Sequence, residues 1–282
     1  MTAETGKPEN RKDRNLKIGY MAAAVPAVLL GVGAMAYHGE PLMLWGQQAA
    51  ALAVFAALAV LLHRFIKKAN PAVWSTILLL ILAATLFGTE TGGAKRWVNL
   101  RVLHVNAALL VLPALILLAG DMKRPWAALL FSGAVVCLQP DTSQMAALFV
   151  AALPILWKHR RNVLLSAVSL ALLAAGVIKC LLTPVSLEPV LYCEGILSML
   201  GGISPALQIV GWLALALIPG LMAYGYVKNR EPQLLSLLLY YGVTLLFTLQ
   251  GTYPVPLMGF GVSPVAGYYL AYPLILRYHK NT

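Results

Sequence analysis

Four polar segments interrupt long apolar runs, and they hold the residues whose types could do chemistry. These segments are 88–97 (GTETGGAKRW), 138–144 (LQPDTSQ), 183–202 and 251–264. They offer carboxylates for proton transfer, Lys and Arg for anion binding, and Gly and Pro for tight turns. Ionisable groups beside apolar runs of membrane-spanning length are expensive to keep, so each segment is a candidate for a functional site.

Each segment also has a purely structural interpretation. The first could be a glycine turn with an interfacial Trp97 and snorkelling bases. In the second, Asp141 or Thr142 could cap the next helix, and Glu194 in the third could be a surface acid near a helix start. The fourth could be a loop that feeds the last span. Neither the five histidines nor the three cysteines have the spacing of a metal site, so no metal ligand is predicted.

The composition shows which elements must position these segments. The chain has 282 residues, of which 60% are hydrophobic and only 11% charged, whereas a soluble domain carries about 25% charged residues. Such a chain cannot cover a water-soluble surface. The net charge of +11 could suggest nucleic acid, but the bases form short clusters between apolar runs, as in cytoplasmic loops. We therefore expect an integral membrane protein that does not bind nucleic acid.

Ten apolar runs are candidate membrane spans. They cover roughly 18–37, 43–63, 72–88, 103–119, 125–139, 143–157, 163–183, 204–227, 233–250 and 256–276. The runs are apolar all round, which favours helices over the alternating strands of a barrel. Sheets are therefore not expected. The predicted fold is an all-α polytopic membrane bundle of about ten transmembrane helices.

The basic residues give the orientation. With the N-terminus inside, all but four of the 21 Lys and Arg residues fall on the cytoplasmic side, and the exceptions are Lys95, Arg96, Arg101 and Lys179. This bias predicts cytoplasmic termini, a basic cytoplasmic tail over 1–17 that is disordered, and one transmembrane domain over 18–282. A cleavable signal peptide ending near 34–36 is the alternative, but the first apolar stretch is too long for it.

Taken together, the four segments resemble the SEDS family (shape, elongation, division and sporulation), the FtsW/RodA/SpoVE-like peptidoglycan polymerases. The family pattern NGAxRWI is matched by 93–98 (GAKRWV), and QPDxGT by Gln139-Pro140-Asp141. The segment that carries the family's proposed catalytic Asp aligns with 192–201, which places Glu194 there. The final glycine-rich pattern aligns with 254–263, ending at Ser263. The resemblance covers nearly the whole chain in the family's order.

The resemblance implies an enzyme, a glycosyltransferase that polymerises lipid II on the outer face of the bacterial cytoplasmic membrane in cell division or cell shape. Glu194 would be the catalytic base for the acceptor hydroxyl. Pyrophosphate and substrate contacts would come from Lys95, Arg96, Trp97, Arg101, Gln139, Asp141 and Ser263. Asp141 would orient a base or hold a divalent cation such as Mg²⁺, and no other cofactor is implied. The implied partner is a class B penicillin-binding transpeptidase.

This sequence also departs from the family pattern. The family's QPSE motif is replaced by 103–106 (LHVN), and only about ten residues, 183–192, separate the seventh span from Glu194, where the family has several dozen. Two alternatives therefore stay open. The chain could be a catalytically inactive scaffold for a penicillin-binding protein, or a flippase for lipid-linked precursors. Cys180 and Cys193 are also placed near the same outer surface, where a disulfide between them is a weaker hypothesis.

Overall fold

The structure is a computed structural model that describes residues 11–67, 70–88, 90–100, 103–159, 162–185 and 187–279. Its helices are α1 (Arg11–Ala22), α2 (Val25–Tyr37), α3 (Leu42–Lys67), α4 (Pro71–Ala84), η1 (Thr85–Phe87), α5 (Ala107–Asp121), α6 (Pro125–Leu138), α7 (Thr142–Lys158), α8 (Val163–Leu182), α9 (Ile196–Ile203), α10 (Pro205–Asn229), α11 (Pro232–Thr248), α12 (Val262–Ile275) and η2 (Leu276–Tyr278). Two strands, β1 (Trp97–Leu100) and β2 (Leu103–Asn106), form an antiparallel hairpin.

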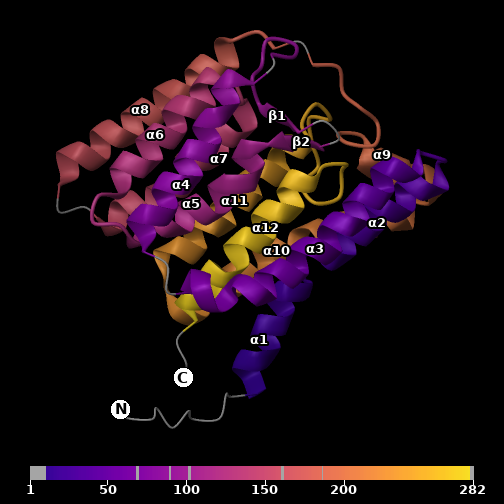
Figure 1. The fold of residues 1–282 in the computed structure, drawn as a ribbon, viewed down its shortest axis with the longest axis horizontal. Coiled ribbons are helices and arrows are strands. Elements are labelled where there is room, and N and C mark those ends of the chain that lie inside the picture. Colours follow the sequence, from indigo (N-terminus) through magenta and orange to yellow (C-terminus); the bar gives the residue numbers. More distant parts are fainter. Residues whose placement is uncertain are drawn as a thin grey trace.

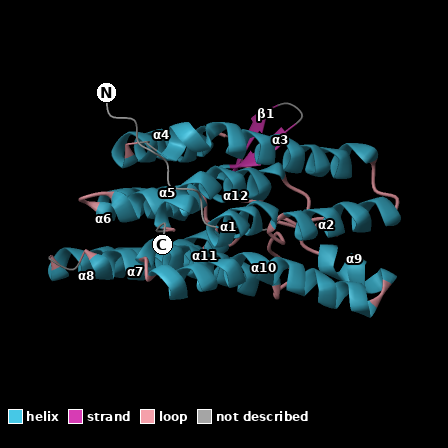
Figure 2. Cartoon of the chain, turned by 90° about the horizontal axis from the view of Figure 1, so that it is seen from below, coloured by secondary structure: helices cyan, strands magenta, loops and turns pink. Residues whose placement is uncertain are grey.

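The long helices pack in three layers (Figures 1 and 2). α3 and α4 form one outer layer, while α7, α8, α10 and α11 form the other. The middle layer contains α2, α5, α6 and α12, and α12 packs between α3 and α5. The hairpin lies at one end of the bundle, beside the beginnings of α5 and α12. The described parts of the four polar segments lie at this end, and most of α9 belongs to the third of them.

The ten predicted spans are confirmed as helices. The first is formed by α1 and α2 together, the third by α4 with η1, and the others by α3, α5 to α8 and α10 to α12. By length and composition alone, four stretches among the described residues are long and apolar enough to cross a membrane: Arg14–Tyr37, Leu42–His63, Val163–Leu182 and Pro205–Asn229. The remaining apolar helices are shorter. Tilted or thin members of a compact bundle have such lengths.

The structure corrects the sequence interpretation in three places. A β-hairpin of Trp97–Leu100 and Leu103–Asn106 replaces the beginning of the predicted fourth span, and it lies at the end of the bundle against the beginnings of α5 and α12. The short helix α9 was missed because its eight residues fall almost entirely within the segment 183–202, which is predicted as a polar connection before the span at 204–227; only Ser204 separates α9 from α10. Of the predicted disordered tail over 1–17, residues 11–17 are helical, since they extend the first span toward its N-terminus, and residues 1–10 lie outside the described residues.

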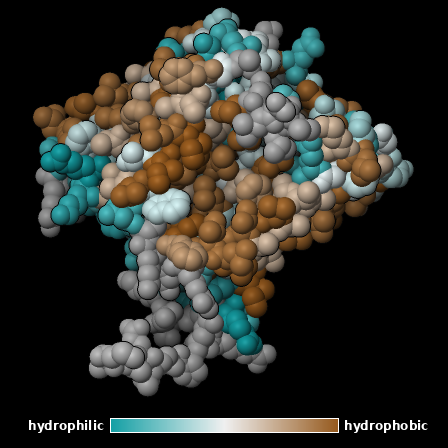
Figure 3. Space-filling view, viewed as in Figure 1, coloured by the Kyte–Doolittle hydropathy of each residue, from teal (hydrophilic) through white to brown (hydrophobic). Residues whose placement is uncertain are grey.

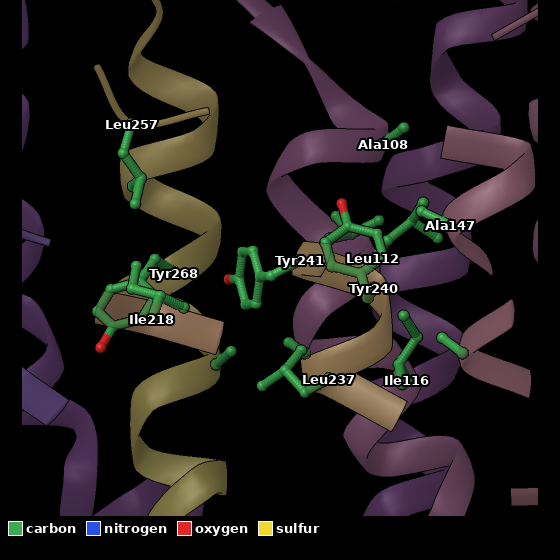
Figure 4. Close-up of a cluster of buried hydrophobic side chains, with 14 of the residues drawn as sticks. Ala108, Leu112, Ile116, Ala147, Ile218, Leu237, Tyr240, Tyr241, Leu257 and Tyr268 are labelled. Atoms are coloured by element: carbon green, nitrogen blue, oxygen red, sulfur yellow. The ribbon is translucent and has the colours of Figure 1, made fainter. Parts of the chain in front are cut away.

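The bundle has an apolar core and an apolar outer surface. Leu112, Ile116 and Leu237 pack around Tyr240 and Tyr241 in the interior (Figure 4). The outward surfaces of α3 and α8 are equally apolar, and Figure 3 shows hydrophobic side chains over much of one face. Phe65 is 73% exposed and Leu182 is 78% exposed. Large apolar side chains are stable at such exposure when lipid surrounds them, which identifies a multi-pass membrane protein.

Side chains at the end of the bundle opposite the hairpin hold the helix ends together. Tyr278 Oη donates to Asp121 Oδ2 at 2.9 Å, and an Arg277 nitrogen lies 3.7 Å from the same carboxylate. Gln233 Nε2 donates to Asp121 Oδ1 at 3.0 Å. The Tyr20 and His279 rings are 5.0 Å apart, so the described beginning and end of the chain meet here. This arrangement agrees with an even number of spans.

The orientation gives a first testable prediction. In a cysteine-free background, a single cysteine at Thr91 should react with a membrane-impermeant thiol reagent in intact spheroplasts. Single cysteines at Asn70 and Asn162 should react only after permeabilisation. Both positions are exposed at the beginning of a helix, and the basic residues near them predict that they lie on the cytoplasmic side. Labelling is measured as a mass shift. The reverse pattern would contradict both the orientation and the family resemblance.

Candidate functional site at the outer end of the bundle

Five chain segments enclose a small cavity of about 40 Å³ beneath the β-hairpin. It is lined by residues that are distant in sequence: Arg96, Trp97, Asn106, Leu109, Asp141, Ser143, Gln144, Leu187, Glu188, Pro189, Glu194, Thr244, Thr252, Tyr253, Pro254 and Pro256. Among the predicted site residues, Arg96, Trp97, Asp141 and Glu194 therefore share one cavity. This convergence is a property of the fold, since the four residues come from three different polar segments.

Arg96 and Asp141 form a buried ion pair. Arg96 Nε lies 3.6 Å from Asp141 Oδ2, and the two side chains are only 10% and 4% exposed. The guanidinium also donates a hydrogen bond to the carbonyl oxygen of Pro140. A buried charge is stable only when an opposite charge or a hydrogen bond compensates it. The ion pair therefore connects Arg96, the residue before β1, to the turn between α6 and α7. The charge of Arg96 thus faces the cavity from a fixed position.

The carboxylate of Asp141 has a second role as the N-cap of α7. Its Oδ1 accepts hydrogen bonds from Gln144 N at 3.2 Å and from Ser143 Oγ at 2.9 Å. Below it, Tyr240 Oη donates to Gln144 Oε1 at 2.6 Å. The capping interpretation of Asp141 is therefore confirmed, and the ion pair with Arg96 is made in addition to it.

Two predicted site residues lie outside the cavity lining and hold its walls. Gln139 is fully buried, and its Nε2 donates to the Thr85 hydroxyl, which joins the α6–α7 turn to η1. Ser263 Oγ, at the start of α12, accepts a hydrogen bond from Asn106 N at 2.8 Å. Asn106 in turn caps α5 through Leu109 N at 3.2 Å. These contacts give both residues a structural explanation.

The other two basic residues predicted for the site, Lys95 and Arg101, are not part of the cavity lining that the structure describes. Lys95 is half-exposed and lies 4.0 Å from Glu90, away from the cavity lining. This exposed pair contributes little to stability. Arg101 falls outside the described residues. The direct positive charge in the cavity lining therefore comes from Arg96.

Glu194 lies in a tight turn directly before α9. Its carboxylate Oε2 accepts a hydrogen bond from Val190 N at 2.8 Å, while its own N–H donates to Val190 O at 2.9 Å. The turn is docked on the following polar segment, because Phe260 N donates to Tyr192 O at 2.9 Å and Val255 N donates to Cys193 O at 3.3 Å. Backbone hydrogen bonds therefore hold the Glu194 carboxylate in a defined position.

Gln48 of α3 holds the segment on which Glu194 rests. Its side chain is fully buried and donates to Leu257 O at 2.8 Å and to Gly259 O at 3.1 Å, and it accepts from Gly261 N at 3.1 Å. A side chain at Gly259 would meet Cys193 O at 2.3 Å, so only glycine allows this close approach. The role of Gln48 could not be predicted from the sequence, because a single Gln in an apolar run has no distinctive spacing.

The cavity lining carries more negative than positive charge. Asp141, Glu188 and Glu194 face a single base, Arg96. Glu188 was not a predicted site residue, because it has no counterpart in the family pattern, yet the exposed turn after α8 brings it beside Glu194. Within the described part of the chain, no three His, Cys, Asp or Glu side chains converge to hold a metal ion. The divalent cation stays a prediction.

The cysteines near this end are all free thiols, so the proposed disulfide between Cys180 and Cys193 is wrong. Cys180 faces Cys137 on the neighbouring helix α6 instead. Cys193 Sγ lies 3.4 Å from Phe260 O, and burial, together with the nearby Glu194, raises the pKa of its thiol well above the usual value. Because the thiolate is the reactive form, Cys193 should resist thiol reagents at neutral pH.

The fold is that of a known membrane protein. No protein-family profile matches this sequence, and no curated protein matches it either. Among solved structures, the chain is similar to the rod shape determining protein RodA of Thermus thermophilus, with a TM-score of 0.61 and 18% identity over 97% of this chain and 98% of that one. A point variant of the same protein gives a TM-score of 0.60 and 19% identity over 98% and 100%. The chain therefore has the multi-pass fold of RodA, and the SEDS resemblance of its four polar segments is confirmed at the level of the fold.

Proposed function

We propose that this chain is a divergent SEDS-type protein of cell-wall biogenesis that polymerises lipid II at the outer face of the bacterial cytoplasmic membrane. The observation that carries the proposal is the cavity that brings Arg96, Asp141 and Glu194 together beneath the β-hairpin. A base and an anion-binding guanidinium in one enclosed place are what glycosyl transfer from a pyrophosphate donor requires. The similarity of the fold to RodA, a rod shape determining protein, supports the coarser part of the proposal, a role in cell-wall biogenesis.

The residues suggest a division of labour in this reaction. Glu194 takes the proton of the acceptor sugar hydroxyl while the hydroxyl oxygen forms a bond to the anomeric carbon of the donor. The bond from that carbon to the pyrophosphate oxygen breaks, and the lipid pyrophosphate leaves with the electron pair. Arg96 stabilises the charge that develops on the leaving group, because its planar guanidinium suits bidentate contacts with phosphate. Asp141 holds Arg96 in position through the 3.6 Å ion pair.

The size of the cavity sets a condition on this mechanism. About 40 Å³ has room for only a few water molecules, far less than a disaccharide pyrophosphate needs. The substrate must therefore enter by displacing part of the lining. The Glu194 turn is held by backbone hydrogen bonds of Tyr192 and Cys193, whereas Glu188 is exposed, so the wall at Glu188 is the one we expect to be displaced.

One observation favours the scaffold as a second candidate. The charge of Arg96 is already compensated by Asp141 and by the Pro140 carbonyl, and the lining around it is closed. An inactive SEDS-like protein that only binds a class B penicillin-binding transpeptidase through its spans would need a stable outer end but no open substrate site. The same geometry would then serve to rigidify the outer end of the bundle.

A lipid II assay distinguishes these functions. Purified protein in detergent, incubated with labelled lipid II, should yield polymerised glycan that is resolved by gel electrophoresis. The same preparation in vesicles is tested for translocation of the lipid-linked headgroup. Translocation without polymer would replace the proposal by the flippase, and neither product together with stable co-purification of a transpeptidase would replace it by the scaffold.

A further inference from the structure

A second hollow lies at the opposite, cytoplasmic end of the bundle. It is a groove of about 870 Å³ between the end of α7, the beginning of α8, the end of α10 and the beginning of α11. These four helices follow one another in one outer layer (Figure 2), so the groove opens on the membrane-facing surface. Its walls are mainly hydrocarbon, with Leu153, Leu156, Ala167, Leu170 and Leu235 among them. Its volume lies within the range of about 300–1,000 Å³ that holds small ligands.

Two bases mark the cytoplasmic end of this groove. Lys158 ends α7, and Arg230 follows α10, and both are exposed members of the lining. The Arg230 guanidinium lies 5.8 Å from the centre of the Tyr226 ring, another lining residue, which holds the charge over the groove. Glu231, the acid next in sequence, does not line the groove. An apolar channel with cations at one end complements a lipid that has an anionic headgroup.

The backbone at Arg230 is a second, independent observation. Arg230 ends α10 in the left-handed conformation, with φ 57° and ψ 26°. Glycine or asparagine usually occupies this position, because other side chains are strained there. A bulky residue in such a conformation is a reason to look for a functional use of its side chain. At Arg230 the strained backbone directs a guanidinium, the group best suited to phosphate, to the mouth of an apolar groove.

The space beside Lys158 provides room for a headgroup. A neighbouring hollow of about 680 Å³ shares Leu156, Lys158 and Ser166 with the groove and also contains Lys123 and His159. Its one acid, Asp121, is neutralised by Arg277 at 3.7 Å. The adjoining Trp157 is 71% exposed, as expected of an aromatic residue at the membrane interface.

We propose that this groove binds an anionic phospholipid of the cytoplasmic leaflet. One acyl chain lies along the apolar walls, and the phosphate contacts Arg230 and Lys158. The cytoplasmic leaflet carries anionic lipids, and basic pockets between transmembrane helices on that side bind their headgroups. The proposal concerns the end of the bundle opposite the cavity around Glu194, so it does not depend on the proposed enzymatic function.

The test measures which lipid the full-length protein retains. The protein is reconstituted in bilayer discs of equal parts phosphatidylglycerol and phosphatidylcholine, released, and examined by native mass spectrometry. We expect phosphatidylglycerol to be enriched roughly tenfold or more among the retained lipids, because two bases contribute to the headgroup contact. The double variant Lys158→Gln/Arg230→Gln should lose this preference. Ala167→Trp, which fills the apolar part, should lower the total lipid retained with the bases intact.

Matched controls separate the site from general effects. Lys179→Gln removes an exposed base at the other end of α8, and Leu172→Trp adds bulk to an exposed position of α8 outside the groove lining. Both should retain lipid like the wild type, and so should Glu194→Gln. Equal retention of both lipids by the wild type would overturn the proposal, as would an unchanged preference in the double variant. Retention of a polyprenyl phosphate in place of phospholipid would overturn it too. If the double variant fails to fold, Ala167→Trp decides.

Discussion

Replacing Glu194 by glutamine is expected to lower lipid II polymerisation at least about 100-fold, because the variant lacks the proton acceptor for the sugar hydroxyl. The fold should be unaffected. Glutamine is close in size, and its side-chain oxygen can still accept the hydrogen bond from Val190 N that Glu194 makes at 2.8 Å. The thermal melting temperature should therefore match that of the wild type. Glu194→Asp should keep part of the activity, since the carboxylate remains on a stem one carbon shorter.

Two further acids serve as comparisons for Glu194. Glu188→Gln changes an acid in the same cavity, but we expect a smaller loss because Glu188 is exposed and has no counterpart in the family pattern. Glu40→Gln changes an acid between α2 and α3 that does not line the cavity, and it should have no effect. Full activity in Glu194→Gln would remove its catalytic role. A larger loss in Glu188→Gln would transfer that role to Glu188.

Replacing Arg96 by methionine is expected to damage both stability and activity. The change leaves the Asp141 carboxylate, only 4% exposed, without its counter-charge. Breaking a buried ion pair by removing one partner costs about 3–5 kcal/mol, so the melting temperature should fall markedly. Arg96→Lys should be intermediate, because the charge survives while the planar fork of the guanidinium is lost. Lys17→Ala, on α1 at the cytoplasmic end, is the control and should behave like the wild type.

A double variant separates the structural from the catalytic contribution of Arg96. Asp141→Asn neutralises the partner, and asparagine caps a helix about as well as aspartate does. Arg96→Met/Asp141→Asn should therefore recover much of the lost stability, because the two residues are directly coupled. If Arg96 binds the pyrophosphate, polymerisation should stay low in this stabilised protein. Recovery of activity together with stability would show that Arg96 only holds the fold.

Composition and charge along the chain are enough to predict the class of fold and its orientation. Sparse charge and ten apolar runs require a membrane bundle, because only helices and closed barrels satisfy the backbone in lipid. The placement of all but four bases on one side predicts the orientation, and both inferences depend only on local composition. The order of the four motifs also indicates the SEDS-like fold. The motifs are 93–98, 139–141, 192–201 and the final glycine-rich segment 254–263. Local patterns of this kind survive even at 18% identity to RodA.

The tertiary structure alone decided which polar residues meet. Arg96, Asp141 and Glu194 come from segments far apart in sequence, and only the packing of the helices and of the connections between them places the three residues around one cavity. Packing also assigned Gln139 and Ser263 to the walls, brought in Glu188, and gave Gln48 its hold on the Gly259 turn. The physical reason is that a hydrogen bond or ion pair depends on distances across the bundle, whereas hydropathy and charge are summed along the chain.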